Sequence, residues 1–187
     1  FIDKKGAWVV QPQYSQCYEF RNGYAQVSKK SKWGLIDKKG IEVLAPEYYD
    51  VTNVSDGVLA VNKEIGKGWE LIDIKGRKLS DKTFDRVKEF NGDLAPARNN
   101  EDKYGFINAK GEWVILPEYT GAESFGNDLA AVEIDYKWGY IDRTGKIMIQ
   151  PEYDRPGRFK NGVAMVEQGS EYMYISTKGD VILRFNK

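Results

Sequence analysis

The stretch Trp33-Gly34-Leu35-Ile36-Asp37-Lys38-Lys39-Gly40 decides the fold, because variants of it recur along almost the whole chain. Each copy has an aromatic residue, usually Gly, an apolar residue, Ile, usually Asp, two variable residues and Gly. The other copies span residues 69–76, 104–111, 138–145 and 172–179, and a copy without its first two residues spans 1–6. The Ile falls at positions 2, 36, 72, 107, 141 and 175, a period of 34 to 36 residues. Such a period is typical of tandem repeat proteins.

The repeat predicts one array over residues 1–187, because units of this size bury a core by stacking on their neighbours. We delimit the units as residues 1–32 (partial), 33–68, 69–103, 104–137, 138–171 and 172–187 (partial). The chain begins at Phe1, without Met and inside a motif, so we expect a piece of a longer protein. A targeting segment need not lie within such a piece.

Composition narrows the classes of partner and compartment. The chain has 28 basic and 28 acidic residues and no basic block, which disfavours nucleic acid and anionic membranes as partners. No apolar run reaches the roughly 18 residues that cross a bilayer, so we expect no membrane insertion. The only cysteine, Cys17, forms no internal disulfide, so cytoplasmic and periplasmic or exported locations are both compatible.

The motif predicts a first strand that is apolar on both faces. The residue before each Ile is also apolar, and adjacent strand residues point to opposite faces. These preceding residues are Phe1, Leu35, Leu71, Phe106, Tyr140 and Tyr174. Each such strand must therefore be covered from two sides.

The rest of the unit predicts two more strands. A second strand follows the Gly and is expected to stop at Pro12, Pro46, Pro117 or Pro151, because proline cannot donate to a ladder. An anchoring aromatic or apolar residue and an Asn-Gly-like turn come next. A third strand of small and apolar residues then leads into the next motif, and we expect Pro96 to break it in one unit.

These elements predict an all-β protein of about 35-residue repeats, each a three-stranded antiparallel meander. No segment has sustained helical periodicity. Five complete meanders and an extra two-stranded hairpin at residues 1–12 fit neither a neat five-bladed nor a neat six-bladed ring. We favour a propeller-like stack, with an open β-solenoid or superhelix as the alternative.

The residues that recur in register are assigned structural roles. The aromatic residues are expected to pack in the core, and the Asp to accept backbone hydrogen bonds in a turn that Gly completes. A ladder of cation ligands is the alternative for Asp3, Asp37, Asp73 and Asp142, but the spacing of a calcium loop is lacking. The full structural set is Trp33, Gly34, Ile36, Asp37, Gly40, Trp69, Ile72, Gly76, Tyr104, Ile107, Gly111, Trp138, Gly139, Ile141, Asp142 and Gly145.

On these residues the chain resembles the WG (or KWG) repeat family of bacterial and some eukaryotic proteins. The resemblance is carried by Lys-Trp-Gly at 32–34 and 137–139, Pro-Glu-Tyr at 46–48, 117–119 and 151–153, and Phe-x-x-Gly-x-Ala at 159–164. It covers essentially the whole chain and implies a binding or scaffolding role without catalytic residues. Glu70 and Met173 depart from it by replacing the Gly, and Lys82 by replacing the Pro.

Catalytic chemistry is not predicted. The chain has no histidine, Cys17 therefore has no histidine partner, and no phosphate-binding Gly-rich motif is present. Acid pairs such as Glu101 and Asp102 are expected to be solvated. We expect no enzyme activity, no catalytic or metal-binding residues and no cofactor.

Four aromatic residues are the candidate ligand contacts. Trp8 and Trp113 stand where other units have Glu42, Lys78 or aliphatic residues, and Tyr49 and Tyr136 lie in predicted loops. Each ring either stacks on a ligand or fills a local gap. We expect a scaffold that binds an unknown protein partner through an extended repeat surface, and the alternative is a carbohydrate or cell-wall binding module.

Overall fold

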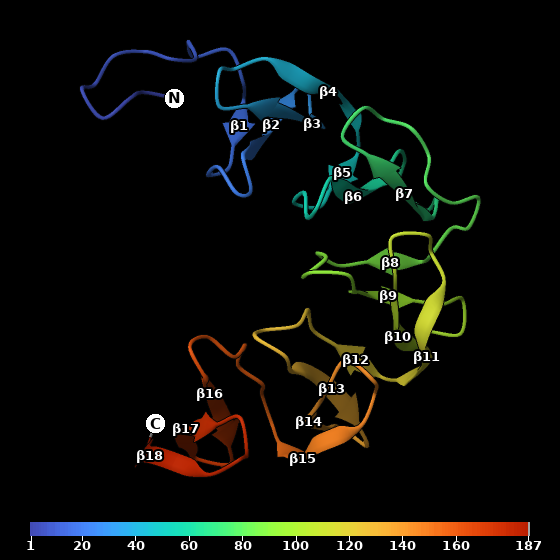
Figure 1. The fold of residues 1–187 in the computed structure, drawn as a ribbon, viewed down its shortest axis with the longest axis vertical. Coiled ribbons are helices and arrows are strands. Elements are labelled where there is room, and N and C mark those ends of the chain that lie inside the picture. Colours follow the sequence, from blue (N-terminus) through green and yellow to red (C-terminus); the bar gives the residue numbers. More distant parts are fainter. Residues whose placement is uncertain (187) are drawn as a thin grey trace. The chain divides into compact units, whose positions relative to one another are not determined.

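The computed structural model describes residues 1–186, and every regular element in that range is a β-strand (Figure 1). It confirms the all-β prediction. The described residues hold no helix long and apolar enough to cross a membrane. The chain divides into two compact units, unit 1 at Phe1–Thr83 and unit 2 from Phe84 onward.

Five antiparallel sheets follow one another along the chain, with strands in sequence order in each. The two sheets of unit 1 are β1 (Gln16–Cys17), β2 (Tyr24–Lys29), β3 (Lys32–Asp37) and β4 (Glu42–Tyr48), then β5 (Asp50–Val51), β6 (Val58–Asn62) and β7 (Trp69–Asp73). The first two sheets of unit 2 are β8 (Arg86–Val87), β9 (Ala95–Arg98), β10 (Tyr104–Ile107) and β11 (Trp113–Tyr119), then β12 (Gly121–Ala122), β13 (Ala130–Ile134), β14 (Lys137–Ile141) and β15 (Ile147–Tyr153). Its last sheet is β16 (Val163–Gln168), β17 (Glu171–Ser176) and β18 (Val181–Asn186).

The meander is confirmed in four of the five sheets within residues 1–186, whereas after β7 the predicted second strand is reduced to one bridge between Ile72 and Lys78. The structure also adds a short strand that the sequence did not predict. In four of the sheets a two-residue strand (β1, β5, β8 or β12) pairs with the predicted third strand. In the first sheet this strand is β1, whose residues Gln16 and Cys17 are both exposed. A strand this short and polar has no apolar alternation by which it could be recognised.

The prediction that the second strand stops at proline is wrong. Strand β15 runs through Pro151 to Tyr153, and between the pairs Trp138–Tyr153 and Tyr140–Ile149 one residue of β14 opposes three residues of β15. The extra residues form a bulge, in which a missing N–H is tolerated. The strands β4 and β11 contain the same irregularity.

The bulge explains the glycine of the Trp-Gly motif. A Cβ on Gly139 would lie 2.5 Å from the Ile149 carbonyl oxygen and 2.7 Å from the Pro151 nitrogen, too close for any other residue. Gly34 and Gly105 meet the bulges of β4 and β11 in the same way. Where Met173 replaces the glycine, the chain has no proline at the corresponding place, and β17 pairs with β18 residue by residue from Glu171 to Tyr174.

The prediction that Pro96 breaks the third strand is also wrong. Pro96 lies within β9, opposite Phe106 of β10. Its carbonyl oxygen accepts a hydrogen bond of 2.9 Å from the Lys88 N–H, so its backbone polar groups face the β8 side of the strand. The N–H that proline lacks would point to the same side, beyond the end of β8 at Val87. The ladder between β9 and β10 therefore loses no hydrogen bond.

The hairpin predicted at residues 1–12 is reduced to one bridge. Ile2 pairs with Trp8, and the Asp3 N–H donates to the Ala7 carbonyl at 2.9 Å, but no strand forms there. Because no described strand flanks this bridge on either side, it lacks the ladders that extend the other pairs.

The Asp-x-x-Gly segments have the geometry of the predicted turn. Asp37 Oδ1 accepts hydrogen bonds of 2.9 Å from the N–H groups of Lys39 and Ile41, and Gly40 donates to the Asp37 carbonyl. Gly40 has a φ of 82°, which other residues rarely adopt. The same pattern recurs at Asp3, Asp73 and Asp142.

Within each unit the core lies between consecutive sheets, as the two-faced first strand predicted. Tyr140 of β14 packs with Phe159, Ala164 and Ile175 of the following segment. Its neighbour Ile141 instead packs in a cluster with residues of the preceding sheet. In unit 1, Leu35 and Ile36 divide between two clusters in the same manner.

We predict that Gly139→Ala lowers the free energy of unfolding by about 2 to 3 kcal/mol, because the new methyl group collides with the β15 backbone. Urea unfolding measures this change. The control is Gly162→Ala, whose Cβ meets nothing within 4 Å and costs only about 1 kcal/mol for its positive φ. Equal destabilisation by the two substitutions contradicts the bulge explanation.

We predict that the free energy of unfolding falls as the pH rises above 10. Burial, assisted by the adjacent carboxylate, raises the pKa of both Tyr119 and Tyr153 from 10.0 to about 12. A raised folded-state pKa stabilises the fold below the unfolded pKa, and this contribution disappears between about pH 10 and 12. Tyrosinate absorbance should show a late-titrating fraction that Tyr153→Phe reduces. An unchanged fraction in Tyr153→Phe contradicts the assignment.

Candidate functional site

The structure does not bring the four predicted aromatic contacts together. Trp8, Tyr49 and Tyr136 are 55%, 46% and 88% exposed, whereas Trp113 is half-buried with its ring edge-on to Phe84 at 5.5 Å. No ring contact joins any two of the four within residues 1–186. Their role in ligand contact stays a prediction, and the packing of Trp113 gives that ring a structural role.

The last sheet carries an apolar face that sequence reasoning missed. Met165, Tyr174 and Leu183 are direct cross-strand partners on β16, β17 and β18, so their side chains share one face. Tyr172 and Phe185 form the next row, with ring centroids 5.7 Å apart. We call these five residues the Tyr174 face.

The Tyr174 face is the counterpart of surfaces that are buried elsewhere in the chain. Tyr174 is 37% exposed, whereas Tyr140 one repeat earlier is 1% exposed beneath the following sheet. Leu183 is likewise exposed, and the matching Ile149 is buried. The repeat position of Tyr174 was available in the sequence, and it is the signal that could have identified this face.

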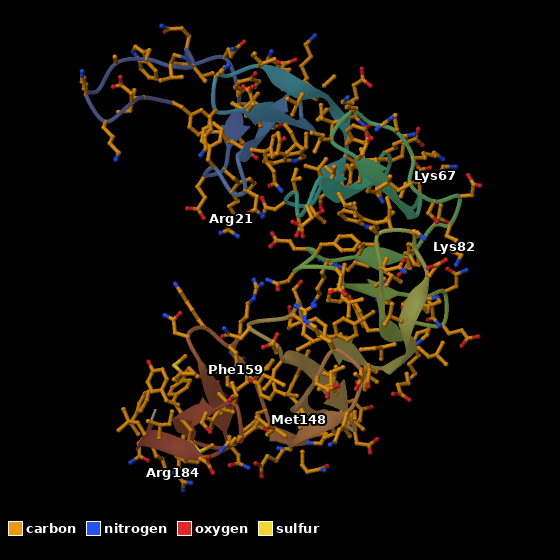
Figure 2. All side chains as sticks on the ribbon, in the orientation of Figure 1. Arg21, Lys67, Lys82, Met148, Phe159 and Arg184 are labelled. Carbon is orange, nitrogen blue, oxygen red and sulfur yellow. The ribbon has the colours of Figure 1, made fainter. Side chains whose placement is uncertain are left out.

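A second feature is a cavity of about 390 Å³ in unit 2. It lies where three successive loops meet, the loops that lead into β9, β13 and β16. We call this cavity the turn cavity. It is lined by Asn91, Gly126, Asn127, Arg158, Phe159, Lys160 and Asn161. Figure 2 shows Phe159 with the other side chains of this region.

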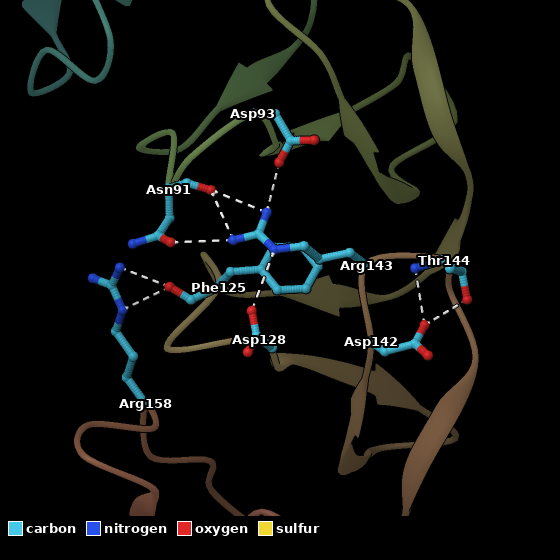
Figure 3. Close-up of polar contacts among 8 residues, drawn as sticks. All are labelled: Asn91, Asp93, Phe125, Asp128, Asp142, Arg143, Thr144 and Arg158. Carbon is cyan, nitrogen blue, oxygen red and sulfur yellow. Dashed lines mark hydrogen bonds and ion pairs between the residues drawn. The ribbon is translucent and has the colours of Figure 1, made fainter.

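Arg143 links two of these loops (Figure 3). Its Nη1 donates to Asp93 Oδ1 at 2.7 Å, and both Nη1 and Nη2 donate to the Asn91 carbonyl at 3.3 Å. Its guanidinium carbon lies 4.6 Å from the centre of the Phe125 ring, and Nε lies 3.8 Å from Asp128 Oδ1. One cation thereby joins the loops before β9 and β13.

Arg158 makes the corresponding link between the loops before β13 and β16. Its Nε and Nη2 donate to the Phe125 carbonyl oxygen at 3.0 and 2.7 Å. One repeat earlier, the Ser124 hydroxyl donates to the Glu89 carbonyl at 2.6 Å. In these two loops the residue before the anchoring aromatic therefore links the loop to the preceding one.

No group of three or more potential metal ligands occurs within the described part of the chain. Asp142 was one of the candidates for a cation ladder. Its Oδ1 accepts hydrogen bonds within its own turn, including one of 2.6 Å from the Thr144 hydroxyl. That hydroxyl, followed by the turn N–H groups, holds the pKa of the Asp142 carboxyl below its ordinary value.

A family profile described as "WG containing repeat" matches the chain at residues 1–33, 33–67, 71–103, 104–138 and 138–172. The chain belongs to the WG-repeat family. The matched segments contain the Trp-Gly motif and the bulged strand, which are in backbone contact in the structure. No curated protein matches this chain.

Solved structures similar to this WG-repeat chain are β-propeller proteins. Hsv2 of Kluyveromyces lactis aligns with a TM-score of 0.61 at 13% identity, over 88% of this chain and 60% of Hsv2. Apo AztD of Citrobacter koseri aligns with a TM-score of 0.57 at 14% identity, over 93% of this chain and 59% of AztD. The WD40 β-propeller domain of Doa1 aligns with a TM-score of 0.50 at 8% identity, over 94% of this chain and 71% of that one.

These likenesses confirm the propeller-like stacking of the meanders. The chain spans about 60% of the length of the first structures it matches. At these identities the likeness shows the fold alone.

We predict that Arg143→Lys lowers the free energy of unfolding by about 1 to 2 kcal/mol, because an ammonium group cannot reproduce the forked contacts to Asn91 and Asp93. Thermal or urea unfolding provides the measurement. The matched control is Arg86→Lys, at an exposed position on the edge strand β8, which should change stability little. Equal effects at the two positions contradict the linking role of Arg143.

Proposed function

We propose that this WG-repeat chain is a non-catalytic module that binds a protein partner, and that the partner docks on the Tyr174 face. The observation that carries the proposal is the row of Met165, Tyr174 and Leu183, three directly paired apolar side chains that no described residue covers to the extent seen in the other sheets. Contiguous exposed apolar surface of this kind marks sites of protein interaction.

The occupant that fits this face is an apolar β-sheet surface of the partner. The Tyr174 face repeats a surface that the following sheet covers elsewhere in the chain. Tyr140 and Ile149, the counterparts of Tyr174 and Leu183, are covered by Phe159, Ala164 and Ile175. A partner sheet in which small and aliphatic side chains alternate around one aromatic anchor therefore has the shape to cover the Tyr174 face.

The chemistry of the chain supports binding without catalysis. It has no histidine, and its net formal charge is zero. Two of its perturbed carboxylates are engaged in ion pairs: Lys78 and Lys63 hold the pKa of Glu70 below its ordinary value, and Lys29 does so for Glu42. We infer that neither nucleic acid nor a cofactor is needed for this role.

A carbohydrate-binding role is the second candidate, and Tyr136 favours it. Asp135 and Tyr136 have φ values of 50° and 61° in the turn between β13 and β14, a conformation that tyrosine rarely adopts. The tight turn holds the ring almost fully in solvent, where it can stack on a sugar. If glycans bind here, Tyr136→Ala should abolish their retention and Tyr174→Asp should not.

Site-specific photo-cross-linking tests the protein-binding proposal. We expect a benzophenone side chain at Leu183 to cross-link, in an extract of the source cells, to an apolar strand segment of one protein, and Tyr174→Asp to remove the product. The matched control is the same probe at Leu116, an exposed residue of β11. Circular dichroism verifies that Tyr174→Asp stays folded. Equal cross-linking from both positions, or an undiminished product with Tyr174→Asp, overturns the proposal.

A further inference from the structure

We infer that the turn cavity of unit 2 binds an oxyanion, a carboxylate or phosphate group. The lining residues contain two cations, Arg158 and Lys160, and no acidic residue. The remaining polar side chains that line it are the amides of Asn91, Asn127 and Asn161. A concave site of cations and amide donors has the chemistry that recognises a planar or tetrahedral anion.

Arg158 is held so that part of its guanidinium remains available. Nε and Nη2 are both engaged by the Phe125 carbonyl oxygen, which fixes the plane of the group. Its Nη1 has no hydrogen-bond or ion-pair partner among residues 1–186, and neither has the Lys160 ammonium. A guanidinium that is already oriented loses little conformational freedom on binding a ligand.

The Asn91 amide is turned so that it presents a donor. Its Oδ1 accepts from Arg143 Nη2 at 3.4 Å, and Figure 3 shows the amide nitrogen directed away from Arg143. The Asn127 amide is oriented similarly, because its Oδ1 accepts from the Gly162 N–H at 3.4 Å. Both NH2 groups are therefore left for a ligand, and they match an acceptor-only anion.

The nearby acids do not neutralise the cavity. Asp93 and Asp128 lie on the neighbouring loops, but both face Arg143, at 2.7 Å and 3.8 Å. The positive charges of Arg158 and Lys160 are therefore not balanced by these two acids. Since Arg158 and Lys160 are exposed, the attraction is screened by salt, and we expect weak binding that declines as ionic strength rises.

Amide-resolved NMR titration of the chain tests this site, with inorganic phosphate and succinate as separate probes and sodium chloride as the ionic-strength control. We expect saturable shifts at Asn91, Asn127 and Lys160 with at least one probe, and the probe that saturates identifies the preferred oxyanion. Lys160→Gln should weaken binding about tenfold, since it removes one charged hydrogen-bond donor.

The control variant is Lys178→Gln, which removes an exposed lysine from the β17–β18 turn and should leave the titration unchanged. Shifts that grow linearly, or that sodium chloride reproduces, overturn the inference. So does a titration that Lys160→Gln leaves unaltered. Because the Tyr174 face takes no part in this titration, its outcome is independent of the proposed protein partner.

Discussion

The structure depends on one packing constraint: the motif strand of each sheet (β3, β7, β10, β14 or β17) carries two adjacent apolar residues that point to opposite faces. Tyr140 packs toward the following sheet and Ile141 toward the preceding one, and both are almost fully buried. A sheet of this kind has no solvent face, so its stability comes from neighbours on both sides. The same constraint makes the Tyr174 face a candidate for binding, because its apolar side chains match those buried in other repeats and no described residue covers them to the same extent.

A second constraint operates within each sheet and joins the two parts of the family motif. The bulge that admits Pro151 brings the β15 backbone onto the middle strand, and only glycine leaves room for it at position 139. The glycine and the proline are therefore two consequences of one backbone contact. The two repeats with Glu70 and Met173 at the glycine position also lack the proline, which agrees with this coupling.

Much of the fold follows from the sequence, since period, two-faced strands and Asp-x-x-Gly turns are local patterns. The bulge could not be predicted, because proline alone reads as the end of a strand. Strand β1 and its counterparts were missed because two residues carry no periodicity. The candidate binding surfaces were harder to predict than the fold. Trp8 was noticed because it does not recur between repeats, and Tyr136 because it lies in a predicted loop. Tyr174 occupies an ordinary repeat position and is distinguished only by its exposure in the structure. The turn cavity depends on how Arg143 and Arg158 link loops about 34 residues apart, which no local pattern contains.

The most direct test of the account is hydrogen–deuterium exchange of the free chain, comparing the middle strands β14 and β17. Both strands have hydrogen-bonded neighbours on each side, so they differ chiefly in whether both faces are covered. We predict that the amides of Tyr140 and Ile141 exchange at least tenfold more slowly than those of Tyr174 and Ile175, because opening β14 exposes two packed faces. Equal protection of the two strands would show that cover on both faces is not what stabilises these sheets.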